Sequence, residues 1–369
     1  VSMSLEILAP DLGEIPVFPV TKPDRYDWRD GVLIRTPNWL GDIVMTLPAM
    51  MQLRRAVPEK CGIFVACPKG LAPVFHALPD LVDKVVELRD AHRFPTRAEM
   101  SEIRALYAGI GILFNNSFRD ALWMKAALIP RLYGAAARNR SWLLTRAFQF
   151  PKRQDRVLNR PHHAAKYLSM SMALGAPAWD GSLPEFRIPY EPECASDAVR
   201  KAVESEHVLA VAPGAAYGAA KRWDTERFQE VCRWWLEEKK GYVVVLSARN
   251  EAELASAAVE GLSGDHVIDL AGKTTLTELM KILQNAEMCV ANDSGNMHLS
   301  AVLGGKGVAP FGPTDPAATS PVSAKWSILF NKQECAPCFK RVCPNGSKKC
   351  LTCITAQDVI TRIQSLLNG

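Results

Sequence analysis

The pair Gly41-Asp42 follows the apolar run Gly31-Val-Leu-Ile34 and opens a helix-like stretch. Aspartate commonly caps the unpaired N–H groups of a helix N-terminus, so a structural cap is one interpretation of Asp42. A catalytic base is the other, because open α/β sheets keep their sites at the carboxyl ends of strands and Gly41 lets the chain turn sharply. This stretch alone leaves both interpretations open.

A loop of small residues, Pro213-Gly-Ala-Ala-Tyr-Gly-Ala-Ala-Lys-Arg-Trp223, lies between an apolar run and a helix-like stretch. Its glycines and alanines allow close backbone approach, and the following helix offers N–H groups and a positive dipole end to an anion. Lys221 adds a point charge suited to phosphate. An ordinary loop with a solvated Lys-Arg pair is the alternative, because the sequence is neither a Walker motif nor G-x-G-x-x-G.

A second junction of this kind is Val290-Ala-Asn-Asp-Ser-Gly-Asn-Met-His298. Asp293, Ser294 and Gly295 open a helix there, and His298 lies one turn further on, where it can donate to phosphate. Read singly, Asp293 or Ser294 is a cap and His298 is a satisfied buried histidine. Two such loops in one half of the chain favour a nucleotide diphosphate as the ligand.

Glu251 lies at a third strand-to-helix turn, Leu246-Ser-Ala-Arg-Asn-Glu251. An acid in this position often accepts hydrogen bonds from ribose hydroxyls. A first-turn glutamate also complements the helix dipole. The two interpretations are evenly balanced.

Five cysteines follow near the C-terminus, at positions 335, 338, 343, 350 and 353. The paired C-x-x-C spacing predicts a structural zinc or iron site held by Cys335, Cys338, Cys350 and Cys353. Because a fifth cysteine makes the ligand set ambiguous, reduced thiols without a metal are an equal alternative.

Alternating apolar and amphipathic stretches must position these groups, and they predict parallel sheets with crossover helices, an α/β fold. The expected strands are residues 31–35, 62–66, 84–88, 109–114, 208–212, 242–246, 266–269, 288–291 and 307–309. The expected helices are residues 43–56, 72–78, 97–107, 119–128, 162–174, 225–239, 250–261, 277–285, 295–303 and 357–367. A Gly/Pro-dense stretch, residues 175–184, separates two alternating halves and reads as an interdomain linker.

The chain of 369 residues is long enough for two domains, and its 48% hydrophobic and 22% charged residues are typical of a globular protein. Its net charge of +5 fits acidic partners without requiring them. The absence of a secretory signal pattern and of long apolar runs predicts a cytoplasmic protein. Ten cysteines in such a chain are expected to be reduced.

Together, Gly41-Asp42, the loop 213–223 and the junction 292–298 resemble glycosyltransferase family 9, the ADP-heptose:lipopolysaccharide heptosyltransferases. Asn116-Ser-Phe-Arg-Asp-Ala-Leu122 and Phe311-Gly-Pro-Thr-Asp-Pro316 strengthen the likeness and look most like the heptosyltransferase II branch. The resemblance runs from about Gly31 to the C-terminus.

The resemblance implies a GT-B fold, with two Rossmann-like doubly wound domains facing a central cleft. It implies an N-terminal extension (1–30), an acceptor domain (31–185), a donor domain (186–354) that carries the Cys-rich segment 335–353, and a last helix (355–369) packed back on the N-terminal domain. The implied reaction is inverting transfer of L-glycero-D-manno-heptose from ADP-heptose to the heptose/Kdo inner core of lipopolysaccharide. Catalysis is expected to need no cofactor, with zinc or iron only structural.

Residue by residue, the resemblance makes Asp42 the catalytic base and places Lys221 at the donor diphosphate. The other implied donor contacts are Gly41, Glu251, Asp293, Ser294, Gly295 and His298. Acceptor contacts are expected at Asn116, Arg119, Arg138 and Arg140. This chemistry fits inversion, which needs one base opposite the leaving group and a cation to hold the departing diphosphate.

A basic stretch in the expected acceptor domain fits an acceptor that carries acidic Kdo and phosphates, although a solvated basic face is the alternative. Between Arg138 and Lys166 it contains Arg140, Arg146, Lys152, Arg153, Arg156 and Arg160 against the single acid Asp155. Such an acceptor would place the enzyme at the cytoplasmic face of the inner membrane, in peripheral contact with it.

Two other functions compete with this interpretation. One is a different family 9 transferase with another sugar nucleotide or acceptor. The other is a nucleic-acid-binding protein with a zinc site in the Cys cluster, but its basic residues lie far from the cysteines and the net charge is small. We therefore expect no nucleic acid partner. A dehydrogenase is disfavoured because no G-x-G-x-x-G follows an expected strand.

Overall fold

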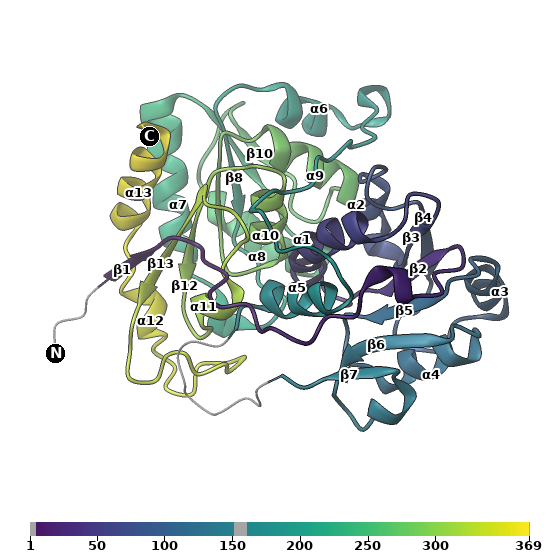
Figure 1. Ribbon diagram of the computed structural model, residues 1–369. Helices are drawn as coiled ribbons and strands as arrows, with labels where there is room; N and C mark the ends of the chain where they lie inside the picture. The colour runs from purple at the N-terminus through teal and green to yellow at the C-terminus, as the bar shows by residue number, and fades with distance from the viewer. Residues whose placement is uncertain (1–4, 151–160, 369) are drawn as a thin grey trace. The chain divides into compact units, whose positions relative to one another are not determined.

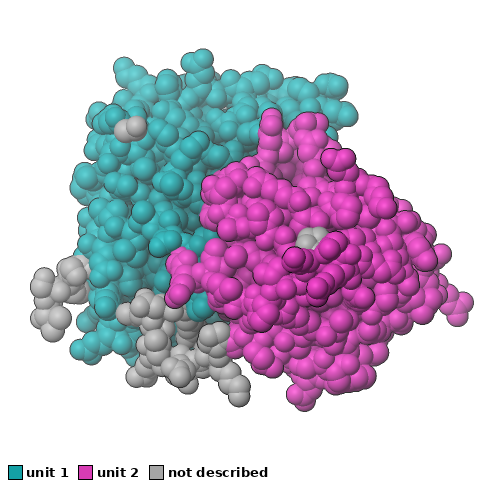
Figure 2. Space-filling view, viewed as in Figure 1, with its two compact units in different colours: residues 1–12, 155–162, 188–369 teal, residues 13–154, 163–187 magenta. Residues whose placement is uncertain are grey.

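The computed structural model describes residues 5–150 and 161–368. The chain divides into two units, each an α/β structure with its own sheet (Figures 1 and 2). Unit 1, teal in Figure 2, comprises residues 1–12, 155–162 and 188–369, and unit 2, magenta, comprises residues 13–154 and 163–187.

The sheet of unit 2 is parallel throughout and runs in the order β4-β3-β2-β5-β6-β7. Its strands are β2 (Gly31–Arg35), β3 (Gly62–Pro68), β4 (Lys84–Leu88), β5 (Ile110–Leu113), β6 (Arg131–Ala135) and β7 (Arg146–Phe148). Every residue of β2 and β5 is buried, as expected for central strands covered by helices on both faces. The order of the strands reverses between β2 and β5.

Five helices connect and cover this sheet: α1 (Leu40–Ala56), α2 (Ala72–His76), α3 (Arg97–Ala105), α4 (Phe118–Ala126) and α5 (His163–Ala173). Side-chain caps set two of their starts, with a capping box of Thr96 and Glu99 on α3 and Ser117 on α4. Helix α5 packs along α1. It thereby lies next to the first turn of the helix that carries Asp42.

The sheet of unit 1 repeats the same pattern in the order β10-β9-β8-β11-β12-β13, again parallel. Its strands are β8 (Val208–Ala212), β9 (Tyr242–Val245), β10 (Val267–Asp269), β11 (Met288–Ala291), β12 (Gly307–Phe311) and β13 (Trp326–Asn331). A further strand, β1 (Leu5–Leu8), pairs antiparallel with β13 at the sheet edge. Part of the expected N-terminal extension is thus a strand of this sheet.

The helices of unit 1 are α6 (Asp197–Glu204), α7 (Thr225–Trp234), α8 (Ala252–Ser256), α9 (Leu276–Asn285), α10 (Gly295–Val302), α11 (Pro316–Thr319), α12 (Lys349–Thr352) and α13 (Ala356–Asn368). Within unit 1, α13 packs on α7 and β12 (Figure 1). Its expected packing on the N-terminal domain stays a prediction. Its buried face of Val359, Ile360 and Ile363 finds apolar partners in the sheet that directly precedes it in the chain.

Both sheets have the strand order of doubly wound nucleotide-binding folds, numbered 3-2-1-4-5-6 from one edge. The prediction of two Rossmann-like doubly wound sheets is confirmed. In such sheets ligands bind beside the carboxyl ends of the strands where the order reverses. The relevant strands are β2 and β5 in unit 2, and β8 and β11 in unit 1. Among the described helices, none is both long and apolar enough to cross a membrane.

Candidate active site

Asp42 lies in the first turn of α1, immediately after β2, and its side chain is 33% exposed. The N-cap of α1 is Trp39, and no side chain caps the helix. His163 on α5 lies beside Asp42, with its Nδ1 3.8 Å from Asp42 Oδ1. The geometry therefore gives no support to the interpretation of Asp42 as a helix cap. Its carboxylate is free to accept a proton.

The surroundings of Asp42 differ from expectation at Gly41. This residue is the second of α1 and is not among the residues with positive φ, so the chain turns before it rather than at it. Tyr167 of α5 lies behind the site, where burial raises the pKa of its phenol well above the usual value and the negative charge of Asp42 adds to the effect. Asp42 thus lies beside a phenol that keeps its proton.

A buried polar cluster follows β5, the second strand at the reversal in unit 2. Asp120 is 1% exposed and pairs with Arg35 Nε at 2.8 Å and with Arg119 Nη2 at 2.9 Å. It also accepts a hydrogen bond from Asn115 Nδ2 at 2.7 Å. Desolvation lowers the pKa of Arg35, and the negative charge of Asp120 opposes that effect. The sequence singled out Asn116 here, but Asn115 is the residue in the cluster and Asn116 is exposed.

Arg140, expected at the acceptor, is fully buried. Its Nε donates to the carbonyl of Ala135 and its Nη1 to the carbonyl of Ser117, each at 3.1 Å. Burial lowers the pKa of its guanidinium to about 10. Arg140 therefore ties the end of β6 to the start of α4, and its charge is not presented to solvent.

The other expected acceptor contacts are more accessible. Arg138 is exposed, and the side chain of Arg119 is 26% exposed. Four members of the basic stretch, Lys152, Arg153, Arg156 and Arg160, lie outside the described residues.

In unit 1, a single amide joins the two loops that follow β8 and β11. Asn292 Nδ2 donates to the carbonyl of Pro213 at 2.6 Å, and Asn292 Oδ1 accepts from the N–H of Trp223 at 2.9 Å. Asn292 thus fixes both ends of the loop 213–223. The sequence contained it within a motif but gave no sign of this role.

Lys221 and Asp293 form an ion pair between these loops, with Nζ 2.6 Å from Oδ2 and side-chain exposures of 11% and 4%. The Thr314 hydroxyl donates to the same Asp293 oxygen at 2.6 Å. Asp293 therefore does not cap α10. Because an ammonium carries three donors, Lys221 keeps two for an anionic ligand.

The N-terminus of α10 is open. Ser294 is its N-cap residue but makes no side-chain cap bond, and its buried Oγ has no hydrogen-bond partner among the described residues. Gly295 begins the helix, and His298 is buried one turn further on. A buried unpaired hydroxyl beside helix N–H groups is an arrangement that a phosphate would satisfy.

Glu251 supports the loop 213–223 from the side of β9. Its Oε1 accepts from the Ala215 N–H at 2.9 Å and from Arg222 Nη2 at 2.8 Å. A Cβ on Gly214 would lie 2.7 Å from Oε2, so a larger residue there would displace the Glu251 carboxylate. Since Oε2 accepts no hydrogen bond from the described residues, it is left for a ligand hydroxyl.

The Cys-rich segment does not form the predicted metal site. Across residues 5–150 and 161–368, no three His, Cys, Asp or Glu side chains are grouped so that they could hold a metal ion. All ten cysteines fall in these ranges, and none forms a disulfide. Burial, and then the nearby thiols of Cys335, Cys338 and Cys343, raise the pKa of Cys350 to about 11.

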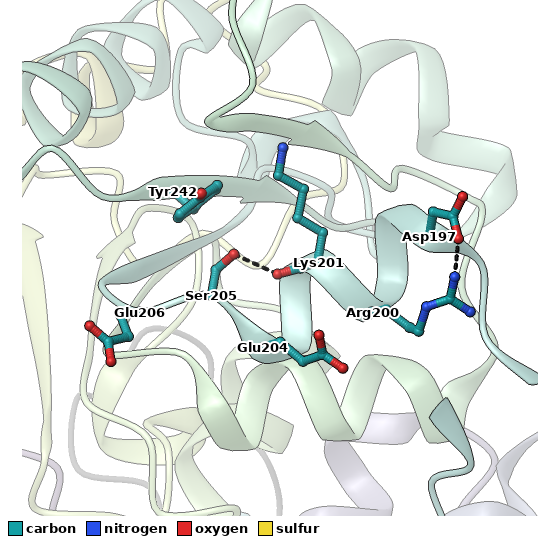
Figure 3. A pocket seen from close by; sticks show the side chains of 7 residues that line it. All are labelled: Asp197, Arg200, Lys201, Glu204, Ser205, Glu206 and Tyr242. Carbon is teal, nitrogen blue, oxygen red and sulfur yellow. Dashed lines mark hydrogen bonds and ion pairs between the residues drawn. The ribbon is translucent and has the colours of Figure 1, made fainter. Parts of the chain in front are cut away.

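A surface pocket of about 560 Å³ lies elsewhere on unit 1 (Figure 3). Its lining residues are Asp197, Arg200, Lys201, Glu204, Ser205, Glu206 and Tyr242, mostly from α6 and the turn after it. Tyr242 begins β9, so the pocket lies at the amino edge of the sheet, opposite to the loops described above. Its three acids outnumber its two bases, and it contains none of the expected site residues.

The model of a family described as glycosyltransferase family 9 (heptosyltransferase) matches residues 98–349. A lipooligosaccharide heptosyltransferase 2 of Haemophilus influenzae is 28% identical over 316 residues, which cover 81% of this chain and 88% of that protein. A lipopolysaccharide heptosyltransferase 2 of Escherichia coli is 26% identical over 91% of this chain and 98% of its own.

A solved structure shows the same fold. The E. coli ADP-heptose lps heptosyltransferase II superposes with a TM-score of 0.72 at 23% identity, covering 91% of this chain and 98% of its own. The GT-B fold class predicted from the sequence is confirmed.

Proposed function

The chain belongs to glycosyltransferase family 9, the heptosyltransferase family, and from this membership we propose that it is an inverting transferase that moves L-glycero-D-manno-heptose from ADP-heptose to the heptose/Kdo inner core of lipopolysaccharide. It is a glycosyl-transferring enzyme, and its relatives are named for heptose transfer to lipooligosaccharide or lipopolysaccharide. The proposal places it at the cytoplasmic face of the inner membrane, where a Kdo-lipid A acceptor would be presented.

One observation carries the proposal: at the strand reversal of unit 1, the enclosed Lys221–Asp293 pair lies beside the Ser294 hydroxyl, which has no hydrogen-bond partner in the described part of the chain. A diphosphate bound there would receive two Lys221 donors, the hydroxyl and the N–H groups of α10. Glu251 Oε2 would accept from the ribose. The same loops contain Gly295 and His298, which complete the proposed donor contacts.

Asp42 would act from the equivalent reversal in unit 2. It takes the proton of an acceptor hydroxyl, while that oxygen forms a bond to the anomeric carbon of heptose. The bond from this carbon to the diphosphate breaks, and ADP leaves with its charge stabilised by Lys221 and α10. Attack opposite the leaving group inverts the anomeric configuration. No step needs a metal ion.

Acceptor contacts are proposed at Asn116, Arg119 and Arg138, whose side chains follow β5 and β6 at the same sheet edge as Asp42. Arg140 would act on the acceptor only through the loop that it holds. Arginine guanidinium groups suit the carboxylates and phosphates of a Kdo-lipid A acceptor.

The proposed function is tested by mass spectrometry of products formed from ADP-heptose and a Kdo-lipid A acceptor, with and without one heptose already attached. We expect a single added heptose on the heptosylated acceptor and little on the other. Transfer to the unheptosylated acceptor alone would contradict the assigned acceptor. Transfer of another sugar nucleotide with none from ADP-heptose would indicate a different family 9 activity.

A further inference from the structure

Residues 335–354, called here the cysteine strap, fold onto the loop 213–223. The N–H of Ala220 donates to the carbonyl of Arg341 at 3.0 Å. The Tyr217 hydroxyl donates to the carbonyl of Phe339 at 2.8 Å. The strap therefore bonds to the part of the loop that leads into Lys221.

The strap holds the end of the loop as well. Trp223 Nε1 donates to the carbonyl of Ile354 at 2.9 Å. Lys348 Nζ donates to the carbonyl of Arg222 at 3.2 Å and to Asp224 Oδ1 at 3.0 Å. Since backbone and side-chain bonds join the two segments along the length of the loop, the strap is a wall of the proposed donor site.

Gly218 shows how close this approach is. Its φ of 152° falls outside the range that side-chain-bearing residues favour, and an added Cβ would lie 2.5 Å from the carbonyl oxygen of Arg341. The loop and the strap thus meet backbone to backbone at Arg341.

Two cations lie at the Tyr217 ring. Lys221 Nζ is 4.8 Å from the ring centroid, and Arg341 Cζ is 5.3 Å from the same centroid. Lys221 is neutralised by Asp293, but within the described part of the chain no carboxylate pairs with Arg341, which is exposed. Arg341 therefore brings a positive charge, not offset by an acid, next to the lysine proposed to face the diphosphate.

We propose that Arg341 is a second ligand of the donor diphosphate, presented to it by the cysteine strap. This inference rests on the proposed function, because it takes a nucleoside diphosphate as the ligand of the loop 213–223. A guanidinium offers paired N–H donors that match two phosphate oxygens, which a lysine cannot do. Both cations lie within cation–π distance of the Tyr217 ring, which keeps Arg341 near Lys221. The strap thereby acquires a binding role that does not depend on a metal.

The test is calorimetric titration of the full-length chain with ADP and with adenosine, which lacks both phosphates. In Arg341→Gln we expect the affinity for ADP to fall about tenfold or more, as for the loss of a charge-assisted hydrogen bond, and the affinity for adenosine to stay within about twofold. Lys340→Gln, which removes the same charge from the neighbouring exposed residue, is the matched control and is expected to bind both ligands as the wild type does.

Each other outcome is decisive. Unchanged ADP affinity in Arg341→Gln would overturn the inference while leaving the proposed function intact. Equal losses for ADP and adenosine would overturn it too, since Arg341 would then act only through the shape of the loop. An equal loss in Lys340→Gln would show a general effect of net charge. A wild-type chain that binds no ADP would overturn the proposed function, and the inference with it.

Discussion

Lys221 and Asp293 form an enclosed ion pair in which the acid has a second partner, Thr314, and the lysine has donors to spare. A nearly buried pair of this kind contributes little net stability, because desolvation offsets most of the Coulombic attraction. We propose that the pair instead holds the ammonium where charge develops on the departing diphosphate.

We predict that Lys221→Ala lowers kcat by more than it weakens ADP-heptose binding. Charge on the leaving group grows in the transition state, so losing this group should raise the barrier by about 2–4 kcal/mol, as for the removal of an oxyanion donor. Steady-state kinetics well below the melting temperature would show the split between kcat and KM. Lys273→Ala, at an exposed pair with Asp269, is the matched control. A change in KM with kcat unchanged would show that Lys221 contributes only to substrate binding.

The side chains proposed for chemistry were singled out from the connections between a strand and the next helix, as at Asp42, Lys221 and Asp293. Residues that act through distant partners were not. Asn292 forms hydrogen bonds with Pro213 and Trp223, and Asp120 on α4 pairs with Arg35 at the end of β2. No local pattern records such pairings. The burial of Arg140 was not predictable for the same reason, because a charged residue in a loop gives no sign that it will be buried.

The loop 213–223 depends on small residues for its supports. Gly214 lies against Glu251, whose Oε1 holds Ala215 and Arg222. A methyl group at Gly214 would push Glu251 away and release both bonds. The loop is thus shaped by the absence of a side chain as much as by the hydrogen bonds around it.

We therefore predict that Gly214→Ala lowers both the melting temperature and the affinity for ADP. The lost bonds of Glu251 and the strain correspond to about 1–3 kcal/mol of stability. Gly70→Ala is the control, since nothing lies within 4 Å of its added Cβ. Thermal denaturation and ADP titration of the two variants give the comparison. If Gly214→Ala behaves like Gly70→Ala, Glu251 does not shape the loop.

Strands with long apolar runs were found from the sequence, whereas others were missed for physical reasons. Strand β7 has only three residues, and β6 begins with an arginine. Strand β1 is short and partly exposed, and it is a strand only because it pairs with β13 at the other end of the chain. Alternation along the chain records local burial but not pairing between distant segments.

The two units repeat one topology, and each places its proposed reactive groups after the two strands where the strand order reverses. Periodicity predicted the class of sheet, because helices alternate with buried strands. The order of the strands follows from long-range packing, which no single segment specifies. The strand order of each sheet brings the four sequence motifs together as two proposed sites, one on each sheet.

We propose that Asp42 accepts the proton of the acceptor hydroxyl. Asp42→Asn keeps the size and polarity of the side chain but removes the base. Because Asp42 makes no capping hydrogen bond, the substitution should not lower the free energy of unfolding. We expect the melting temperature and the affinity for ADP-heptose to be retained. Turnover should fall by about a hundredfold or more, in the range of general-base contributions. Glu59→Gln, exposed just beyond α1, controls for loss of a negative charge.

The deciding measurement is the initial rate of heptose transfer by Asp42→Asn, at saturating ADP-heptose and acceptor, beside the wild type and Glu59→Gln. We predict that Asp42→Asn is folded and binds the donor, and that it transfers heptose at about one hundredth of the wild-type rate or less. A folded Asp42→Asn enzyme with the wild-type rate would contradict it.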